Sequence, residues 1–148
     1  MKSEALDTGK KLEIDQDTVI CRMPSGLVQL TDMQYLRGYC ILTAEPRVPS
    51  LNALEPSARE RFLLDMSLIG DALLEVTDSH RINYAIAGNN MPLLHAHIVP
   101  RYLTESDDML HNHPWAYPPE VMSGNPVDPN RDAPLIKALA EAITRRLK

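Results

Sequence analysis

Cysteine and glycine are scarce in this chain, and each shortage argues against a class of protein. Among 148 residues there are only two cysteines, Cys21 and Cys40, and they do not form a C-x-x-C pair. A chain of this size can build its own hydrophobic core, so it does not need the disulfide framework of small secreted domains. We therefore expect both cysteines to be small buried hydrophobic residues in a protein of the reducing cytoplasm. The six glycines form no glycine-rich phosphate loop.

Long apolar runs and an excess of positive charge are also absent. No segment has the length and apolar character of a membrane span, and residues 1–17 mix lysines with acids, which is not typical of a signal peptide. The 20 acidic residues outnumber the 15 basic ones and give a formal net charge of -5. We therefore expect neither nucleic acid nor a membrane as a partner. A local site for a small anionic ligand remains compatible with this composition.

The residues that are present predict a single α+β domain over residues 1–148. The length fits one ordinary domain, and a hydrophobic fraction of 44% can fill one core. Short β-prone runs predict an antiparallel sheet of about five strands. These strands are expected at 18–23, 27–31, 39–44, 81–87 and 93–101.

Two helices and one irregular segment complete the predicted domain. Apolar residues spaced by three and four predict a long helix at about 57–76, packed on the sheet, and a C-terminal helix at about 132–147. Residues 103–131 are rich in proline, asparagine and aspartate, so we expect an irregular wrap that Trp115 and Tyr117 help to order.

The most informative segment is 93–101, which reads Leu-Leu-His-Ala-His-Ile-Val-Pro-Arg. Successive side chains of a strand point to opposite faces, so His95 and His97 share one face with Leu93 while Ala96 lies on the other. A neutral imidazole can act as nucleophile, general base or metal ligand near pH 7. The strand therefore has one apolar face and one face that can carry chemistry.

The spacing of these histidines alone is compatible with three roles. The pair can be structural, with both rings hydrogen-bonded within the sheet. It can bind metal, with His111 and His113 as further ligands. It can also act in nucleophilic catalysis, in which His95 attacks an electrophile while His97 and Arg101 hold the developing negative charge.

The residues around the pair resemble the signature of the histidine-triad family of nucleotide hydrolases and transferases. That signature alternates histidine with hydrophobic residues and often ends in Pro-Arg, as in 95–101, and here a Gly-Asn-Asn turn precedes it. The similarity extends upstream through 36–42 and covers about 18–102. It places the family's nucleophilic middle histidine at His95 and its phosphate-side third histidine at His97. Leu93 stands where the first histidine of the triad is expected.

The resemblance also implies a nucleotide site. Asn83 matches an asparagine or glutamine near the α-phosphate, Tyr39 stands where some members have a further histidine, and Asp32 lies where the family contacts ribose. Ordinary turn chemistry remains an alternative for Asp32.

Three further residues belong to this expected phosphate site. Asn89 and Asn90 match the polar pair of the loop before the histidine strand, although an Asn-Asn pair after glycine is also ordinary turn chemistry. Arg101 can bind phosphate through two parallel hydrogen bonds, or it can pair with an acid.

The resulting hypothesis is a homodimeric enzyme that needs no metal or cofactor and acts at the α-phosphate of a nucleotide. His95 forms a covalent nucleotidyl-imidazole, and water then releases a nucleoside monophosphate. Dinucleoside polyphosphates such as diadenosine tetraphosphate are the leading substrate class, and nucleoside phosphoramidates come next. Because Leu93 interrupts the triad, a nucleotide-binding regulatory protein with weak or no turnover stays open. A metal-dependent hydrolase or metal-binding protein that uses the two H-x-H pairs is the third alternative.

Overall fold

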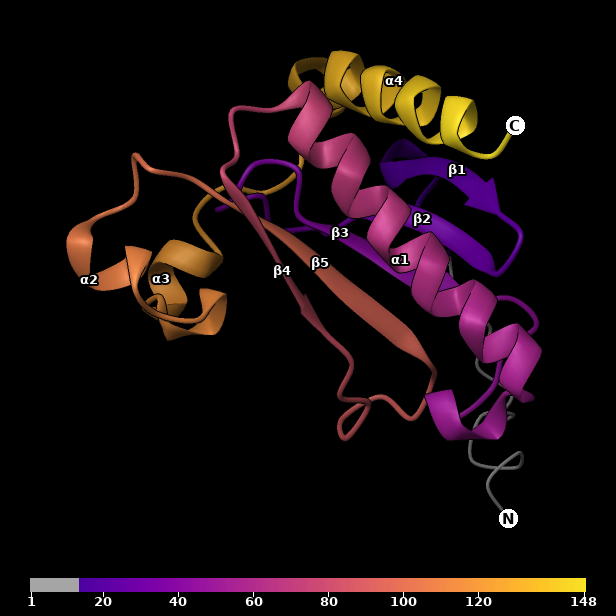
Figure 1. Ribbon diagram of the computed structural model, residues 1–148. Helices are drawn as coiled ribbons and strands as arrows, with labels where there is room; N and C mark the ends of the chain where they lie inside the picture. The colour runs from indigo at the N-terminus through magenta and orange to yellow at the C-terminus, as the bar shows by residue number, and fades with distance from the viewer. Residues whose placement is uncertain (1–13) are drawn as a thin grey trace.

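The structure, a computed structural model, describes residues 14–148 and contains a five-stranded antiparallel sheet (Figure 1). The order across the sheet is β1-β2-β3-β5-β4, and each neighbouring pair is antiparallel. The strands are β1 (Val19–Met23), β2 (Gly26–Leu30), β3 (Cys40–Ala44), β4 (Arg81–Ala85) and β5 (His95–Arg101). The predicted α+β class and the five strands are confirmed. Most of the expectation about residues 1–17 falls outside the described residues.

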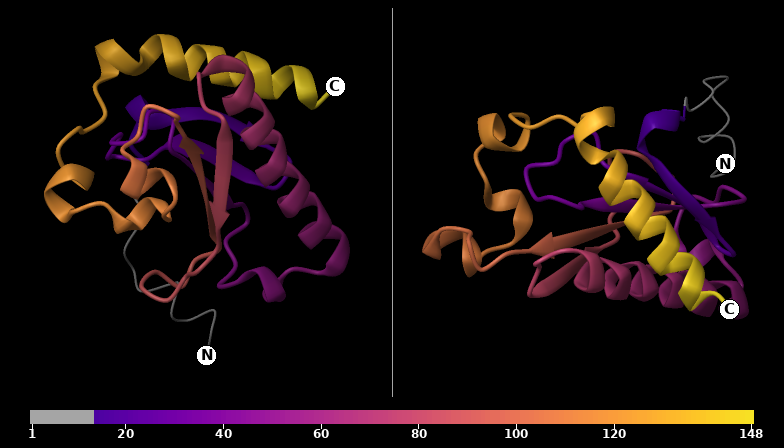
Figure 2. Two further views of the ribbon diagram at one scale, coloured as in Figure 1. Left: turned by 60° about the vertical axis from the view of Figure 1, so that its left-hand side comes forward. Right: turned by 90° about the horizontal axis from the view of Figure 1, so that it is seen from above.

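Two long helices, α1 (Pro56–Val76) and α4 (Pro129–Arg146), cover the same face of the sheet (Figure 2). Pro56 occupies the first turn of α1, where its missing N–H removes no helical hydrogen bond. The Asp128 side chain caps α4 by accepting from the backbone N–H groups of Asn130 and Arg131. This cap explains why α4 begins three residues before the predicted start at 132.

The main core lies between these helices and the sheet. Strand side chains alternate, so every second residue of β2, β3 and β5 enters this core while its neighbours face the other way. The fully buried members with no exposed surface include Val28, Leu42, Ala96, Ile98, Phe62, Ile69, Leu73, Leu139 and Ile143. The stripe predicted on α1 supplies three of them, and this burial fixes which face of each strand remains open.

A buried acid ties the β1–β2 turn to α1, and the sequence alone did not indicate it. Asp65 is fully buried in α1, although the apolar stripe predicted only hydrophobic contacts there. Its carboxylate accepts hydrogen bonds from the backbone N–H and hydroxyl of Ser25 and from the guanidinium of Arg61. Such charge-assisted bonds offset the cost of burying the carboxylate.

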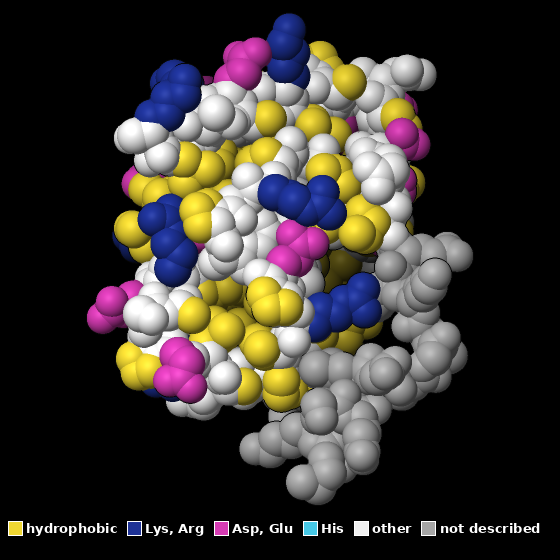
Figure 3. Space-filling model, turned by 90° about the vertical axis from the view of Figure 1, so that its right-hand side faces the viewer, with side chains coloured by type: hydrophobic (Ala, Val, Ile, Leu, Met, Phe, Trp, Pro, Cys, Tyr) yellow, Lys and Arg dark blue, Asp and Glu magenta, His cyan; other side chains and the backbone are white. Residues whose placement is uncertain are grey.

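The segment predicted as an irregular wrap contains three short helical turns. These are α2 (Asp107–Leu110), the 3-10 turn Pro114–Ala116 and α3 (Pro119–Met122). The segment extends beyond one end of the sheet, away from the β1–β2 turn (Figure 1). At the opposite end of the molecule, hydrophobic side chains are scattered among charged ones, and the described residues show no histidine in that view (Figure 3).

Both cysteines are packed as expected. Cys40 is completely buried in the core, and the half-buried Cys21 packs against the same core. Burial raises the pKa of Cys21 to about 11 and raises that of Cys40 still further. Thiols in such surroundings stay protonated and unreactive. Among residues 14–148, no helix combines the length and apolar character needed to span a membrane.

Candidate active site

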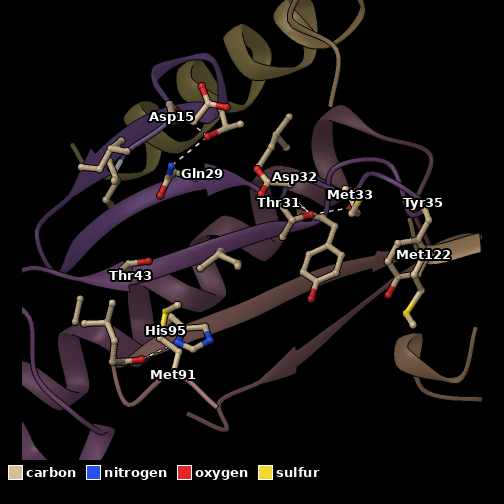
Figure 4. A pocket seen from close by; sticks show the side chains of 18 of the residues that line it. Asp15, Gln29, Thr31, Asp32, Met33, Tyr35, Thr43, Met91, His95 and Met122 are labelled. Atoms are coloured by element: carbon tan, nitrogen blue, oxygen red, sulfur yellow. Dashed lines mark hydrogen bonds between the residues drawn. The ribbon is translucent and has the colours of Figure 1, made fainter. Parts of the chain in front are cut away.

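A cavity of about 740 Å³ lies on the face of the sheet that the long helices leave open. Its floor is formed by β2, β3 and the start of β5, and its lining is mostly apolar. Trp115, Pro119 and Met122 line it from the 103–128 segment, so the irregular part of the chain does approach the histidine face. His95 and Met91 lie on one side of the cavity, while Gln29 and Asp15 lie on the other (Figure 4).

Strand β5 places both histidines on this open face. His95 lies opposite Thr43 and His97 opposite Ile41 on β3, while Ala96 between them is buried on the helix side. The two imidazole rings meet edge to face, with centroids 5.1 Å apart. The predicted division of the strand into an apolar and a chemical face is confirmed.

The backbone fixes the protonation pattern of His95. Its Nδ1 lies 2.6 Å from the carbonyl oxygen of Leu93. A carbonyl can only accept, so Nδ1 carries the hydrogen of the neutral ring and Nε2 keeps its lone pair. His95 is half-buried and lines the cavity, so its free nitrogen is suited to nucleophilic attack.

His97 has the complementary pattern, which side chains rather than the backbone impose. Trp115 Nε1, which can only donate, lies 3.2 Å from the Tyr39 hydroxyl, and that hydroxyl lies 2.7 Å from His97 Nδ1. Among the described residues, His97 Nδ1 is the only acceptor within hydrogen-bond distance of the tyrosine hydrogen, so this hydrogen is directed to Nδ1 and the His97 hydrogen lies on Nε2. Burial, followed by the influence of His95, lowers the pKa of His97 below its ordinary 6.5, so the ring is neutral near pH 7.

Tyr39 is well suited to be the donor in this arrangement. Burial raises its pKa, although the hydrogen bond from Trp115 acts in the opposite direction. The phenol therefore remains protonated near neutral pH. The family resemblance implied a site role for Tyr39, and the structure puts its hydroxyl in contact with His97.

Leu93 contributes its backbone rather than its side chain to the polar site. The side chain is buried with 3% exposure and forms an apolar part of the cavity wall. It offers no group that can donate a proton. The carbonyl of the same residue nevertheless accepts from His95, so the local backbone orients the nucleophile without a histidine at this position.

The structure does not bring Arg101 to the cavity. The residue is buried, and all three of its nitrogens donate within the protein. It binds both carboxylate oxygens of Glu105 and the backbone carbonyls of Met109 and Asn112. Arg101 thereby fastens the segment that follows β5 to the end of this strand, a contact that the strand pattern did not reveal.

Glu105 is the acid that balances this buried guanidinium. Burial alone raises the pKa of its carboxyl, but hydrogen bonds from Arg101, the Tyr102 backbone and Tyr117 together lower the pKa. Glu105 therefore stays ionised opposite Arg101. The pair anchors the segment that carries Trp115.

Asn83 lies on the same face as the histidines, and Arg101 fixes its orientation. Asn83 on β4 lies opposite Val99 on β5, and Ala85 lies opposite His97. Val99 is two residues after His97, so Asn83, Val99 and His97 point to the same face of the sheet. Its Oδ1 accepts from Arg101 Nη1 at 2.8 Å. The opposite end of the amide, Nδ2, is thereby turned away from Arg101 as a donor.

The remaining predicted contacts divide into two groups. Asp32 is exposed and lines the cavity beside Thr31 and Met33. Asn89 and Asn90 are exposed in the turn that follows Gly88, which adopts a φ of 82°, and they do not line the cavity. The structure thus gathers Asp32, but neither member of the asparagine pair, around the open pocket.

The two H-x-H pairs do not combine into one centre. His111 and His113 are exposed, and His111 Nδ1 lies 3.0 Å from the backbone carbonyl of Asp107. Within residues 14–148, no three or more histidine, cysteine or acidic side chains converge as metal ligands. The four-histidine metal site considered from the sequence is therefore absent from the described part of the chain.

Several cavity residues were missed at the sequence level, namely Gln29, Thr43, Arg47 and Met91. Strand alternation could have found the first two, because Gln29 and Thr43 occupy open-face positions once the strand register is known. No comparable periodic signal marks Arg47 or Met91, since both lie in loops.

Comparison with solved structures identifies the fold. No protein-family model matches the chain, and no curated protein matches it. A histidine triad protein from Bradyrhizobium japonicum is 22% identical, with a TM-score of 0.68 over 92% of this chain and 98% of the other. A histidine triad protein from Marinobacter aquaeolei is 20% identical, with a TM-score of 0.71 over 89% and 92%, respectively.

The diadenosine triphosphate hydrolase from Plasmodium falciparum, solved with cyclomarin A, is a more distant match. It is 17% identical, with a TM-score of 0.57 over 99% of this chain and 97% of the other. These identities establish a shared architecture and leave the chemistry to be argued from this chain's own residues.

Proposed function

We propose that this chain, which has the fold of the histidine-triad proteins, hydrolyses or transfers nucleotides at the α-phosphate through His95. The observation that carries the proposal is the complementary hydrogen bonding of two neighbouring imidazoles beside a large cavity. His95 has its lone pair on Nε2, while His97 has its hydrogen there. One ring can attack phosphorus, and the other can donate to the phosphate oxygens.

In the first step, the lone pair of His95 Nε2 attacks the α-phosphorus. A nitrogen–phosphorus bond forms as the bond to the leaving phosphate group breaks, and the leaving group departs with that electron pair. The ring becomes a cation because Nδ1 retains its hydrogen. The carbonyl of Leu93, which accepts that hydrogen at 2.6 Å, stabilises the cation.

The negative charge on the α-phosphate oxygens is met by neutral donors in this scheme. His97 donates through Nε2, and Asn83 offers Nδ2 from the neighbouring strand. Arg101 is not assigned a direct phosphate contact, because all of its nitrogens are occupied within the protein. Asn89 and Asn90 are not assigned one either, because they are exposed in the turn before β5, whereas His97 and Asn83 lie on the sheet face that carries His95.

In the second step, water attacks the same phosphorus on the opposite side from His95. An oxygen–phosphorus bond forms, the nitrogen–phosphorus bond breaks, and the nitrogen recovers its electron pair. The water gives one hydrogen ion to solvent, and a nucleoside monophosphate is released. His95 returns to its starting form without a separate base.

The residue at position 93 favours substrates with a stable anionic leaving group. Leu93 has no hydrogen to give to the departing atom. A polyphosphate leaves as an anion and needs none, whereas the amine of a phosphoramidate needs a proton to leave as a neutral molecule. We therefore rank dinucleoside polyphosphates of the diadenosine tetraphosphate type first and nucleoside phosphoramidates second.

The cavity beside His95 suits the nucleoside part of such a substrate. Its volume of about 740 Å³ and mostly apolar lining are appropriate for a base and a sugar. Asp32 lines the same space, and its carboxylate is assigned to accept hydrogen bonds from the ribose hydroxyls.

Nucleotide binding without turnover is the second candidate. The specific observation in its favour is Leu93, because an apolar side chain occupies the wall where the family pattern expects a histidine. A pocket that retains the base and ribose contacts can bind a nucleotide and release it unchanged. Product analysis separates this candidate from the enzyme.

The decisive experiment is to incubate the protein with a panel of dinucleoside polyphosphates and nucleoside phosphoramidates and to identify the products. The proposal predicts a nucleoside monophosphate from each accepted substrate. With an α-phosphorothioate of one chirality and isotopic water, two successive displacements give net retention at phosphorus. Inversion would rule out a His95 intermediate, and binding without products would favour the second candidate.

We also propose that the protein forms a homodimer through the edge of the sheet. Strand β4 is an edge strand, and an exposed edge can pair with a second copy. Tyr84 on β4 and Leu74 on α1 are both exposed large hydrophobic residues. Sedimentation analysis should give twice the mass of one chain, and Tyr84→Lys should shift it toward the monomer.

A further inference from the structure

The side of the cavity away from His95 holds a small hydrogen-bond chain with a fixed direction. The hydroxyl of Thr18 lies 2.8 Å from the carbonyl oxygen of Asp15, and Gln29 Nε2 lies 3.1 Å from the same hydroxyl. All three residues line the cavity, and Thr18 itself is buried with 1% exposure. The close view shows the bonded Gln29 with its amide at the cavity surface (Figure 4).

The chemistry of the donors determines which end of the Gln29 amide faces the cavity. The Asp15 carbonyl can only accept, so the single hydrogen of the Thr18 hydroxyl is committed to it. The hydroxyl oxygen can then only accept from Gln29. The opposite orientation would place two oxygens together with no hydrogen between them. Gln29 is therefore held with Nε2 toward Thr18 and its carbonyl oxygen, Oε1, free to accept from a ligand.

The surroundings of Oε1 are those of a site for a flat, partly polar ring. Leu27 and Ile41 form apolar parts of the cavity lining next to Gln29, and the Asp15 carboxylate adds another acceptor at the same side. This part of the wall therefore offers acceptors above an apolar floor. It complements a ring that carries an N–H donor on its edge.

The sheet register puts this site at a suitable distance from the histidines. Gln29 lies opposite Ile41, and Ile41 lies opposite His97, so the three residues form one row across β2, β3 and β5. Two strand spacings separate the ends of the row, which is about 10 Å. That is comparable to the reach of a nucleotide from its α-phosphorus to the edge of its base.

We propose that Gln29, held by Thr18, selects nucleotides whose base carries an exocyclic amino group on the edge away from the sugar. This inference rests on the proposed function and specifies the nucleoside that the site takes. Adenine and cytosine present an amino group at this edge and can donate to Gln29. Hypoxanthine and uracil present an oxygen there, which faces the Gln29 oxygen without a hydrogen between them.

Binding of product mononucleotides tests this inference without requiring turnover. Calorimetry should compare AMP with IMP and CMP with UMP, since each pair differs at the selected edge. We expect AMP to bind roughly 10- to 100-fold more tightly than IMP, because IMP loses one hydrogen bond and leaves two acceptors opposed. The CMP and UMP pair should show the same direction, and a preference confined to one pair assigns the site to that base.

Three variants separate the selection from general binding. Gln29→Leu should reduce the AMP-to-IMP ratio to about one, because the acceptor is removed. Thr18→Val should also lower the AMP-to-IMP ratio, because the Gln29 amide can then rotate and offer either end to the base. Thr18→Ser keeps the hydroxyl and should preserve the ratio. Gln16→Leu makes the same glutamine-to-leucine change at an exposed residue outside the cavity lining and should leave the ratio unchanged.

The outcomes distinguish this inference from the function on which it rests. Equal binding of AMP and IMP by a protein that hydrolyses dinucleoside polyphosphates overturns the role of Gln29 alone. A preference that survives Gln29→Leu does the same. Failure to bind any of the four mononucleotides, together with no hydrolysis, overturns both proposals.

Discussion

The two faces of the sheet are built from alternate residues of the same strands, yet they differ in almost every property. On β3, Leu42 has no exposed surface and lies in the core beneath the helices, while its neighbours Ile41 and Thr43 are half-buried beside the cavity. On β5, Ala96 is fully buried between two half-buried histidines. Apolar burial stabilises one face, whereas hydrogen bonds organise the other.

This difference shows how the chain separates stability from chemistry. The helix face brings α1 and α4 onto the sheet and removes aliphatic and aromatic side chains from water, at roughly 25 cal/mol per Å² of apolar area. Among the described residues, the open face is lined by loops and short turns rather than by a long helix, so His95 stays accessible from the cavity. Substitutions on the two faces should therefore produce different kinds of defect.

The largest expected effect is on the open face, at His95. His95→Ala removes the proposed nucleophile, so turnover should fall at least about a thousandfold while nucleotide binding and the unfolding temperature change little. Steady-state kinetics, binding calorimetry and thermal unfolding measure the three quantities. His111→Ala is the matched control, because His111 is exposed in a loop outside the cavity lining. Undiminished turnover in His95→Ala would remove the covalent mechanism.

Adjacent residues of β3 provide a direct contrast between the faces. Leu42→Ala should lower the free energy of unfolding by about 2–5 kcal/mol, because it opens a cavity in the packed core. Ile41→Ala should cost about 1 kcal/mol but weaken nucleotide binding, because Ile41 lines the pocket. Urea denaturation and calorimetry measure these effects. If the two variants lose stability equally, the open face carries more packing energy than its exposure indicates.

Tyr39→Phe tests whether the open face depends on hydrogen-bond direction. It removes the hydroxyl between Trp115 and His97 but keeps the ring that packs with Leu36 and Val99. We expect about a tenfold loss in kcat, with a small change in stability, because His97 no longer has one enforced tautomer. A stability loss without a kinetic effect would make Tyr39 a packing residue.

Leu93→His tests the missing position of the triad. The new imidazole can supply a proton, so hydrolysis of a phosphoramidate should rise by several-fold, while hydrolysis of a dinucleoside polyphosphate changes less. The ratio of kcat/KM for the two substrates is the relevant measurement. Leu93→Met is the control, since it alters the apolar wall without adding a proton donor. An unchanged ratio would mean that Leu93 does not determine leaving-group preference.

The smallest expected effect is the pH dependence of stability at His97. Its pKa is lowered in the folded state, so the unfolded chain takes up this proton first as the pH falls below the ordinary value of 6.5. Folding stability should therefore decrease on acidification from about 6.5 and level off below the folded pKa. Urea denaturation over this interval should show a shallower decrease for His97→Gln. Parallel profiles would mean that His97 is equally easy to protonate in both states.

The sequence supplied a large part of this picture where the pattern was local. The apolar spacing of Phe62, Ile69 and Leu73 predicted the face of α1 that packs on the sheet, and alternation predicted that His95 and His97 share a face. Local periodicity predicted these features because it reflects the geometry of single helices and strands.

Contacts outside regular helices and strands were less accessible from the sequence. Arg101 followed the histidine strand and was assigned to phosphate, but Glu105 and two loop carbonyls surround it instead. Asp65 occupied a helix position with no apparent purpose until the Ser25 turn approached it. The partners of Arg101 follow it by 4 to 11 residues in a segment that turns back on the strand, whereas Ser25 lies 40 residues from Asp65, and no helix or strand periodicity encodes either contact.

By itself, then, the sequence determined the sheet, the helices and the strand that presents two histidines, because burial of alternating and helical apolar residues is a property of each segment. Only the tertiary structure decided what those histidines do with their hydrogens. The tautomer of His97 depends on Tyr39 and Trp115. Tyr39 lies 58 positions before His97 in the chain, and Trp115 lies 76 positions after Tyr39. Hydrogen-bond direction requires atoms to meet, and folding alone brings these atoms together.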